Sequence, residues 1–200
     1  MAEIVFVDID TQYDFMKSDG KLYVQGAEGI IPTLRRLTQF ALDNSIPIIG
    51  SMDSHTEDDP EFEDFPPHCV MGTPGQNKIP ETSVESMRMV PVEAAPGDVD
   101  LSPPGPVILA KPTLDLFDNT HTEAAFEATG VKRCAVYGVA TDYCVSIAAK
   151  GLIERGYEIL LVTDAIRSVS PEAGDKAIDE LEAMGTRFVT AADLIAEFEN

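Results

Sequence analysis

Cys144 is the residue whose type and position most favour nucleophilic chemistry. It follows the stretch GVATDY (138–143), where an apolar, β-branched run should end and a helix should begin. Backbone amides and the dipole at a helix start lower the pKa of a thiol, and the same amides can bind a developing oxyanion. The position therefore predicts a reactive thiolate, and the alternative is a small buried side chain near a helix start.

The other two cysteines give weaker signals. Cys134 lies in the middle of an apolar run and is expected to be buried. Cys69 adjoins His68 and could ligate a metal, although such a neighbouring loop thiol is more often incidental. An odd number of cysteines cannot form a complete disulfide framework, so we expect free thiols in a reducing compartment.

A thiol nucleophile needs a base and a group that polarises the pair. Asp10 and Lys111 each end a predicted strand and could converge on Cys144. A partly desolvated carboxylate beside an ammonium can exchange a proton with the thiol, while the ammonium stabilises the negative charge. Either residue alone would fit a salt bridge or a loop cap, but their occurrence together with Cys144 favours a catalytic group.

Two histidines and an aspartate form a candidate metal site. Asp53 and His55 are separated by one residue, so in an extended segment their side chains point the same way, and His68 follows thirteen residues later. Two imidazoles and a carboxylate suit a transition metal better than magnesium or calcium. An ordinary polar loop is the alternative, and His121 is expected to be a solvated or capping residue at a helix start.

The order of the predicted elements gives the fold class. Strands are expected at 4–9, 46–52, 106–111, 133–140, 158–165 and 186–191, and helices at 28–44, 119–130, 142–156 and 171–185. This alternation predicts an α/β fold, a three-layer α/β/α sandwich around a mostly parallel, about six-stranded Rossmann-like sheet. Ligands of such sheets bind beyond the carboxyl ends of the strands, where the candidate residues lie.

One long irregular segment, at about 53–104, interrupts the alternation and carries the candidate metal ligands. Loops of this length inside a compact domain are usually functional or disordered. No glycine-rich dinucleotide or P-loop pattern follows the first strand, so no nucleotide cofactor is expected.

Composition limits the partners. The 200 residues, 44% of them hydrophobic, predict one domain over residues 1–200, and a formal charge of −21 disfavours nucleic acid and anionic membranes. No apolar run is long enough to span a bilayer, and no basic segment precedes the first strand. We therefore expect a cytoplasmic protein that acts on a small molecule.

Several stretches together resemble the isochorismatase-like cysteine hydrolases, and within them the nicotinamidases (pyrazinamidases). The matching stretches are DTQYDF (10–15), SMDSH (51–55), FPPHCVMGTPGQ (65–76), ILAKPTLDLF (108–117), GVATDYCV (138–145) and GYEILLVTDA (156–165). They cover most of the chain in the order of the family. GVATDYCV, together with the aspartate–histidine pair and PHCVMGTPG, is specific.

The resemblance implies a catalytic triad of Asp10 as acid and base, Lys111 as its charged partner and Cys144 as nucleophile. It implies a cis peptide between Val139 and Ala140, with the amides of Ala140 and Cys144 forming the oxyanion hole.

The resemblance also implies a metal, often zinc, with iron or manganese as alternatives. Its ligands would be Asp53, His55 and His68, with Glu61 at the position of a variable fourth ligand. The metal would bind water and the pyridine nitrogen of the substrate, which in the nicotinamidases is nicotinamide.

The implied reaction is hydrolysis of nicotinamide to nicotinate and ammonia through a thioester, as part of NAD salvage. Phe15 and Phe65 would flank the flat substrate, and members of the family commonly form oligomers. The departures from the family pattern are Phe65, where many nicotinamidases carry tryptophan, and Asp8, where the first strand is usually apolar. Another small amide or an isochorismate-like substrate is the alternative.

Two other classes of function compete with this interpretation. A haloacid dehalogenase-type magnesium phosphatase would use Asp8, Asp10, Ser51, Lys111 and Asp164, but Gln12 stands where its motif requires threonine or valine. A non-catalytic binding protein on the same fold would not need Asp10, Lys111 and Cys144. Asp14 is expected to order the turn after the first strand or to approach Lys111, and Asp8 needs a buried partner that the sequence does not name.

Overall fold

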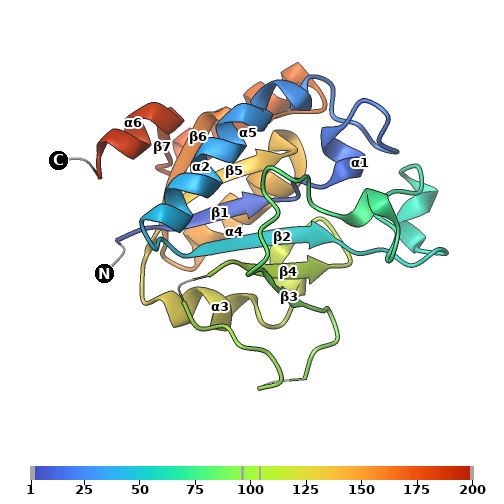
Figure 1. The fold of residues 1–200 in the computed structure, drawn as a ribbon. Helices are drawn as coiled ribbons and strands as arrows, with labels where there is room; N and C mark the ends of the chain where they lie inside the picture. The colour runs from blue at the N-terminus through green and yellow to red at the C-terminus, as the bar shows by residue number, and fades with distance from the viewer. Residues whose placement is uncertain (1–2, 96, 104, 199–200) are drawn as a thin grey trace.

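Seven parallel strands form the central sheet of the computed structural model, which describes residues 3–95, 97–103 and 105–198 (Figure 1). The strands are β1 (Val5–Ile9), β2 (Ile48–Asp53), β3 (Arg88–Val90), β4 (Val107–Lys111), β5 (Arg133–Val139), β6 (Glu158–Arg167) and β7 (Arg187–Val189). Their order across the sheet is β3-β4-β2-β1-β5-β6-β7, and every neighbouring pair is parallel. The three-layer α/β fold predicted from the sequence is confirmed.

Helices cover both faces of the sheet. They are α1 (Tyr13–Met16), α2 (Ile31–Asp43), α3 (Thr122–Thr129), α4 (Ser146–Glu154), α5 (Pro171–Ala183) and α6 (Ala191–Ala196). Short 3₁₀ turns lie at η1 (Ala27–Ile30), η2 (Pro60–Glu63), η3 (Pro74–Gln76) and η4 (Leu116–Asp118). Helices α2 and α6 contact each other on one side of the sheet, and α4 contacts α5 and η4 on the other.

The central strands are buried on both faces of the sheet, which explains why apolar and polar residues do not alternate along them. Every residue of β1, β2 and β4 is buried, as the strands of a covered parallel sheet must be. Local signals set the starts of the last two helices, because the side chains of Ser170 and Thr190 accept hydrogen bonds from the first turns of α5 and α6. No helix among the described residues is long and apolar enough to cross a membrane.

The segment at 53–104 is more ordered than expected and adds the seventh strand. β3 has only three residues and pairs with β4, so its apolar pattern is too short to be recognised in the sequence. The turns η2 and η3 also lie in this segment. The prediction of about six strands therefore missed one edge strand.

Two buried polar side chains, His121 and Asp8, were left open by the sequence, and the structure shows the contacts of both. His121 is the N-cap residue of α3, as the capping alternative predicted, but it is buried rather than solvated. Its side chain makes no capping hydrogen bond, and its Nε2 lies 2.9 Å from the carbonyl oxygen of Ala94. Asp8 finds its partner in Lys78, whose Nζ lies 3.1 Å from Oδ2, and it also accepts a hydrogen bond from the Thr11 hydroxyl at 2.9 Å. A charge within β1 is thus paired inside the protein.

Candidate active site and metal centre

Four adjacent strands bring the candidate residues to one edge of the sheet. Asp10 follows β1, Asp53 ends β2, Lys111 ends β4, and β5 leads to Cys144. Asp53 and Lys111 are register partners, so their side chains start from neighbouring backbone positions. The carboxyl ends of parallel strands meet at one edge, which explains how residues more than a hundred positions apart share a site.

The ammonium of Lys111 is the centre of the catalytic group. Its Nζ lies 3.0 Å from Oδ2 of Asp10 and 3.5 Å from Sγ of Cys144, and it donates a hydrogen bond to Oδ1 of Asp53. Nζ also donates to the carbonyl of Thr113 at 3.0 Å. The candidate atoms of Asp10, Asp53 and Cys144 lie within 4.8 Å of one another, and the cation among them is the lysine.

The opposite charges of Lys111 and Asp53 each stabilise the ionised form of the other. Burial by itself would lower the pKa of Lys111, but the carboxylates of Asp10 and Asp53 outweigh it and raise that pKa, which keeps the ammonium charged. Burial would likewise raise the pKa of Asp53, but Lys111 and the neighbouring histidines lower it. Asp53 therefore stays ionised.

Asp10 differs from Asp53 because burial raises its pKa and Lys111 only partly opposes the rise. One of its oxygens, Oδ1, accepts a hydrogen bond from the Ser51 hydroxyl at 2.7 Å. The other, Oδ2, faces the lysine as an ion pair but has no aligned hydrogen bond. This second oxygen is the one free to take a proton.

Cys144 lies inside an irregular turn rather than at the start of a regular helix. The turn η5 (Thr141–Val145) contains Tyr143 with φ −127° and ψ −111°, and α4 begins only at Ser146. Burial raises the pKa of the Cys144 thiol, while Lys111 opposes the rise. The predicted lowering of this pKa by a helix start is therefore not supported, and a base must remove the proton. The implied cis peptide at Val139–Ala140 is present.

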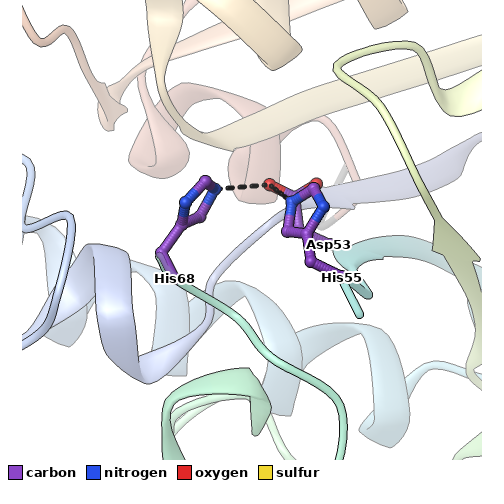
Figure 2. A group of neighbouring side chains, drawn as sticks. All are labelled: Asp53, His55 and His68. Atoms are coloured by element: carbon purple, nitrogen blue, oxygen red, sulfur yellow. Dashed lines mark ion pairs between the residues drawn. The ribbon is translucent and has the colours of Figure 1, made fainter. Parts of the chain in front are cut away.

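The predicted metal ligands converge on one point (Figure 2). Nε2 of His55 lies 3.8 Å and Nε2 of His68 lies 3.7 Å from Oδ2 of Asp53. Ligand atoms about 2.1 Å from a tetrahedral metal lie about 3.4 Å apart, so this spacing is close to that of a coordination sphere. Glu61 reaches both histidine nitrogens, at 3.9 and 3.8 Å, but lies outside the mutually close group of three. Its role as a fourth ligand stays a prediction.

The outer contacts of the histidines fit a bound metal. Nδ1 of His68 lies 2.8 Å from the carbonyl oxygen of Pro66, and Nδ1 of His55 lies 3.1 Å from the Asp59 carboxylate, an ion-pair distance without an aligned hydrogen bond. Metal-bound histidines use their second nitrogen in this way, which fixes the ring orientation. Nε2 of His55 is buried without a hydrogen-bond partner among the described residues, an unmet need that a metal would satisfy. The residues therefore fit a divalent metal.

Two polar residues of the stretch DTQYDF (10–15) hold the backbone at the candidate metal ligands in place. Gln12 clamps the backbone of Asp53, accepting from its amide at 2.7 Å and donating to its carbonyl at 2.9 Å. Asp14 accepts hydrogen bonds from the amides of Cys69, next to His68, and Lys21. Asp14 therefore orders backbone and forms no ion pair with Lys111, while Cys69 is not part of the group of metal ligands.

A cavity of about 190 Å³ joins the catalytic group to the metal ligands. Phe15 and Phe65 line it, as do Cys144, Ala140, Asp53, His68 and Glu61. Phe15 lies 5.3 Å from the His68 ring, and Phe65 lies 6.0 Å from the Tyr143 ring, measured between ring centroids. The two phenylalanines predicted for the substrate are thus both in the cavity wall.

Sequence reasoning missed part of that wall and the contact of Asp59. The additional lining residues are Leu22, Tyr23, Val24, Leu114, Val139, Tyr143 and Val169. Tyr143 precedes the nucleophile in GVATDYCV, which was a usable signal. Val139 ends β5, and the other five come from loops and carry no periodic pattern.

The structure separates the residues of the phosphatase alternative. Asp8 is paired with Lys78, and Oδ1 of Asp164 accepts a hydrogen bond from the amide of Ala191 at the start of α6. Asp164 therefore holds the chain between β7 and α6, and it is not a member of either group of clustered candidate ligands. That alternative loses its predicted metal ligand.

Comparison with known proteins agrees with this geometry. The model of the isochorismatase domain matches residues 4–193. The chain belongs to the isochorismatase family. This isochorismatase-family hydrolase is similar to the nicotinamidase/pyrazinamidase of Mycobacterium tuberculosis, with 24% identity over 199 residues that cover 96% of this chain and 100% of the relative.

Other relatives of this family member agree. The crystal structure of Pyrococcus horikoshii pyrazinamidase in complex with zinc has 28% identity, a TM-score of 0.78, and covers 94% of this chain and 99% of that one. A probable hydrolase of Escherichia coli, YcaC, is 32% identical over 88 residues, which are 44% of this chain and 42% of the relative. The relatives indicate carbon–nitrogen bonds of amides as the target of this hydrolase.

Proposed function

We propose that this hydrolase removes ammonia from a flat aromatic carboxamide, with nicotinamide as the first candidate and pyrazinamide as a close analogue. The observation that carries the proposal is the contact of Lys111 with both Asp10 and Cys144, because Cys144 lines a cavity that is also lined by the candidate metal ligands Asp53 and His68. A second support is the similarity to nicotinamidases and pyrazinamidases over nearly the whole chain.

The shape and polarity of the cavity favour such a substrate. Its wall carries Phe15, Phe65 and Tyr143, whose rings can pack against an aromatic plane. Apart from Asp53, His68 and Glu61, no charged side chain is found among the described residues that line it. The cavity therefore suits an uncharged ring better than a substrate with a carboxylate.

The first half of the reaction is transfer of the acyl group to sulfur. Asp10 takes the thiol proton at Oδ2, and the Cys144 sulfur attacks the amide carbon to form a carbon–sulfur bond. The carbon–nitrogen bond then breaks, and Asp10 returns its proton to the leaving nitrogen, which departs as ammonia. Lys111 stays charged throughout and stabilises the negative charge as it moves between sulfur and carboxylate.

The second half releases the acid. Asp10, again ionised, takes a proton from water as the water oxygen attacks the thioester carbon, and the carbon–sulfur bond breaks. The proton on Asp10 returns to sulfur, which restores the thiol. The amides of Ala140 and Cys144 are proposed to bind the oxyanion in both halves.

Asp53, His55 and His68, with Glu61 as a fourth candidate, would hold the metal, for which zinc is the first choice and iron or manganese are alternatives. A bound divalent metal would supply a Lewis acid that holds a ring nitrogen of the substrate and orients it. The residues of this chain then place the carboxamide over Cys144.

An ammonia-release assay over nicotinamide, pyrazinamide and a panel of other small amides tests the proposal. The expected result is turnover of nicotinamide that is lost in Cys144→Ala and after treatment with a chelator. If nicotinamide is inert and another amide turns over, the named substrate is wrong. If phosphate is released from a phosphoester and release survives in Cys144→Ala, the amide reaction itself is wrong.

A further inference from the structure

Ser51 is a buried hydroxyl residue next to the catalytic group that the mechanism above does not use. It lies in β2, two residues before Asp53, and is fully buried. Its Oγ donates a hydrogen bond of 2.7 Å to Oδ1 of Asp10. Ser51 therefore contacts the base directly, although it contacts neither Cys144 nor Lys111 by any hydrogen bond found in the structure.

The two oxygens of Asp10 are made different by this contact. Oδ1 accepts the hydrogen bond from Ser51, whereas Oδ2 lies 3.0 Å from the Lys111 ammonium and has no aligned hydrogen bond. A carboxylate can rotate about its Cβ–Cγ bond, and its two oxygens are chemically equal until contacts separate them. A fixed donor on Oδ1 holds Oδ2 toward the Lys111 ammonium, which itself lies 3.5 Å from the thiol sulfur.

The backbone of Ser51 is fixed by a second buried contact, with Lys78. Nζ of Lys78 lies 3.3 Å from the carbonyl oxygen of Ser51 and 3.1 Å from Oδ2 of Asp8. Asp8 also accepts from the Thr11 hydroxyl, which lies 2.7 Å from that of Thr82. A chain of buried contacts thus runs from Asp8 through Lys78 and Ser51 to the base.

We propose that Ser51 is a positioning residue, which orients the Asp10 carboxylate so that Oδ2 alone exchanges the proton with Cys144. The inference rests on the proposed thiol chemistry at Cys144. It also gives a role to Asp8, the acid that departs from the family pattern, because Asp8 forms the ion pair that fixes Lys78 against the backbone of Ser51. Loss of a catalytic hydrogen bond to a charged group costs about 10- to 100-fold in rate, and the same loss is expected here.

A matched pair of variants isolates the hydroxyl. Ser51→Thr keeps the hydroxyl, and Ser51→Val has the same shape without it, so any cost of the extra methyl group is common to both. We expect Ser51→Val to lower kcat about 10- to 100-fold relative to Ser51→Thr, with KM changed by less than about threefold. Thr122→Val, which removes another buried hydroxyl hydrogen bond, serves as the control and should leave kcat unchanged.

A second measurement needs no amide substrate. Alkylation of Cys144 by iodoacetamide requires removal of the thiol proton, so Ser51→Val should be alkylated about 10-fold or more slowly than Ser51→Thr at the same pH. Mass spectrometry of the peptide that contains Cys144 gives the rate, and melting temperatures show that both variants are folded.

The inference is overturned if the threonine and valine variants agree within about twofold in kcat and in alkylation rate. A failure of the wild-type protein to release ammonia from any amide would instead defeat the proposed function. The alkylation comparison would still decide the role of Ser51 in that case. Where Ser51→Val does not fold, Ser51→Ala against the wild-type protein gives the same comparison.

Discussion

The ammonium of Lys111 lies 3.5 Å from the sulfur of Cys144 and contacts two buried carboxylates, those of Asp10 and Asp53. One lysine therefore links the proposed nucleophile, the proposed base and a candidate metal ligand. We therefore expect the charge of Lys111 to be necessary both for the proposed reaction and for the fold.

Replacement of Lys111 by methionine should remove activity and destabilise the protein. The change leaves Asp10 and Asp53 as neighbouring buried acids without a cation, and breaking a buried ion pair costs about 3–5 kcal/mol. Urea denaturation measures the free energy of unfolding. Lys150→Met is the control, since its ion pair with Glu180 is on the surface and should contribute about 1 kcal/mol or less. Equal losses in the two variants would contradict the central role of Lys111.

The pH dependence of kcat/KM should report Asp10. Burial raises the pKa of this carboxyl above its ordinary value of 3.8, and the base acts only when ionised. Activity is therefore expected to fall as the pH drops through this raised pKa, at a higher pH than for an ordinary aspartate. A pH–rate profile measures this limb, and a limb at or below 3.8 would contradict the assignment.

The same pKa shift predicts the stability of Asp10→Asn. A raised pKa means that the folded protein favours the neutral carboxyl, so the stabilising contribution is present at low pH and is lost as the pH rises through that pKa. A neutral amide avoids this loss. Asp10→Asn should therefore melt at or above the wild-type temperature at pH 7 while kcat falls at least about 100-fold. A lower melting temperature would show that the pair with Lys111 outweighs the cost of burial.

Metal removal should lower both stability and activity. A metal that binds only the folded protein adds about 2.7 kcal/mol at a free concentration 100 times its Kd, so chelation should lower the melting temperature and re-addition should restore it. Elemental analysis is expected to find about one metal per chain in the wild-type protein and in His121→Gln, and little in His55→Ala or His68→Ala. His121 is the matched control because it is buried but lies outside the metal group. Equal metal content in all four proteins would rule out this site.

Phe65 should act mainly on substrate binding. Its ring lies in the cavity wall against Tyr143 and His68, so Phe65→Ala should raise KM for nicotinamide about 10-fold. Phe65→Trp introduces the residue that many nicotinamidases carry at this position and should leave KM close to the wild-type value. Phe198→Ala, on the surface against Phe40, should leave KM unchanged. A tryptophan variant as weak as the alanine variant would argue against ring packing at this position.

The Asp8–Lys78 pair should matter to stability. Lys78→Met leaves the Asp8 charge buried, with an expected cost of about 3–5 kcal/mol in the free energy of unfolding, whereas the double variant with Asp8→Asn removes both charges and should recover much of it. Denaturation of the two single variants and the double variant gives the coupling energy. Purely additive losses would show that the two side chains do not interact.

The sequence by itself determined the order of the elements and the identity of the chemical groups. Apolar runs such as those of β1, β4 and β5 are long enough to predict, and the strand-end rule directed attention to Asp10, Lys111 and Cys144. The residue types of Asp53, His55 and His68 suggested a metal site, and the family resemblance, carried by several stretches together, favoured it over an ordinary polar loop. The three-residue strand β3, which lies in the irregular segment at 53–104, and the six-residue helix α6, which is less than two turns long, escaped prediction because they carry too little periodicity.

Tertiary structure decided what each group does to its neighbours. The partner of Asp8, the hydrogen bond from Ser51 to Asp10 and the burial of Cys144 all depend on segments that are 33 to 70 residues apart in the chain. The pKa of Cys144 shows the reason most clearly, because a sequence can place a thiol near a helix start but cannot give its desolvation or the distance to a lysine on another strand. Electrostatic effects depend on distance and burial, and both are properties of the folded chain.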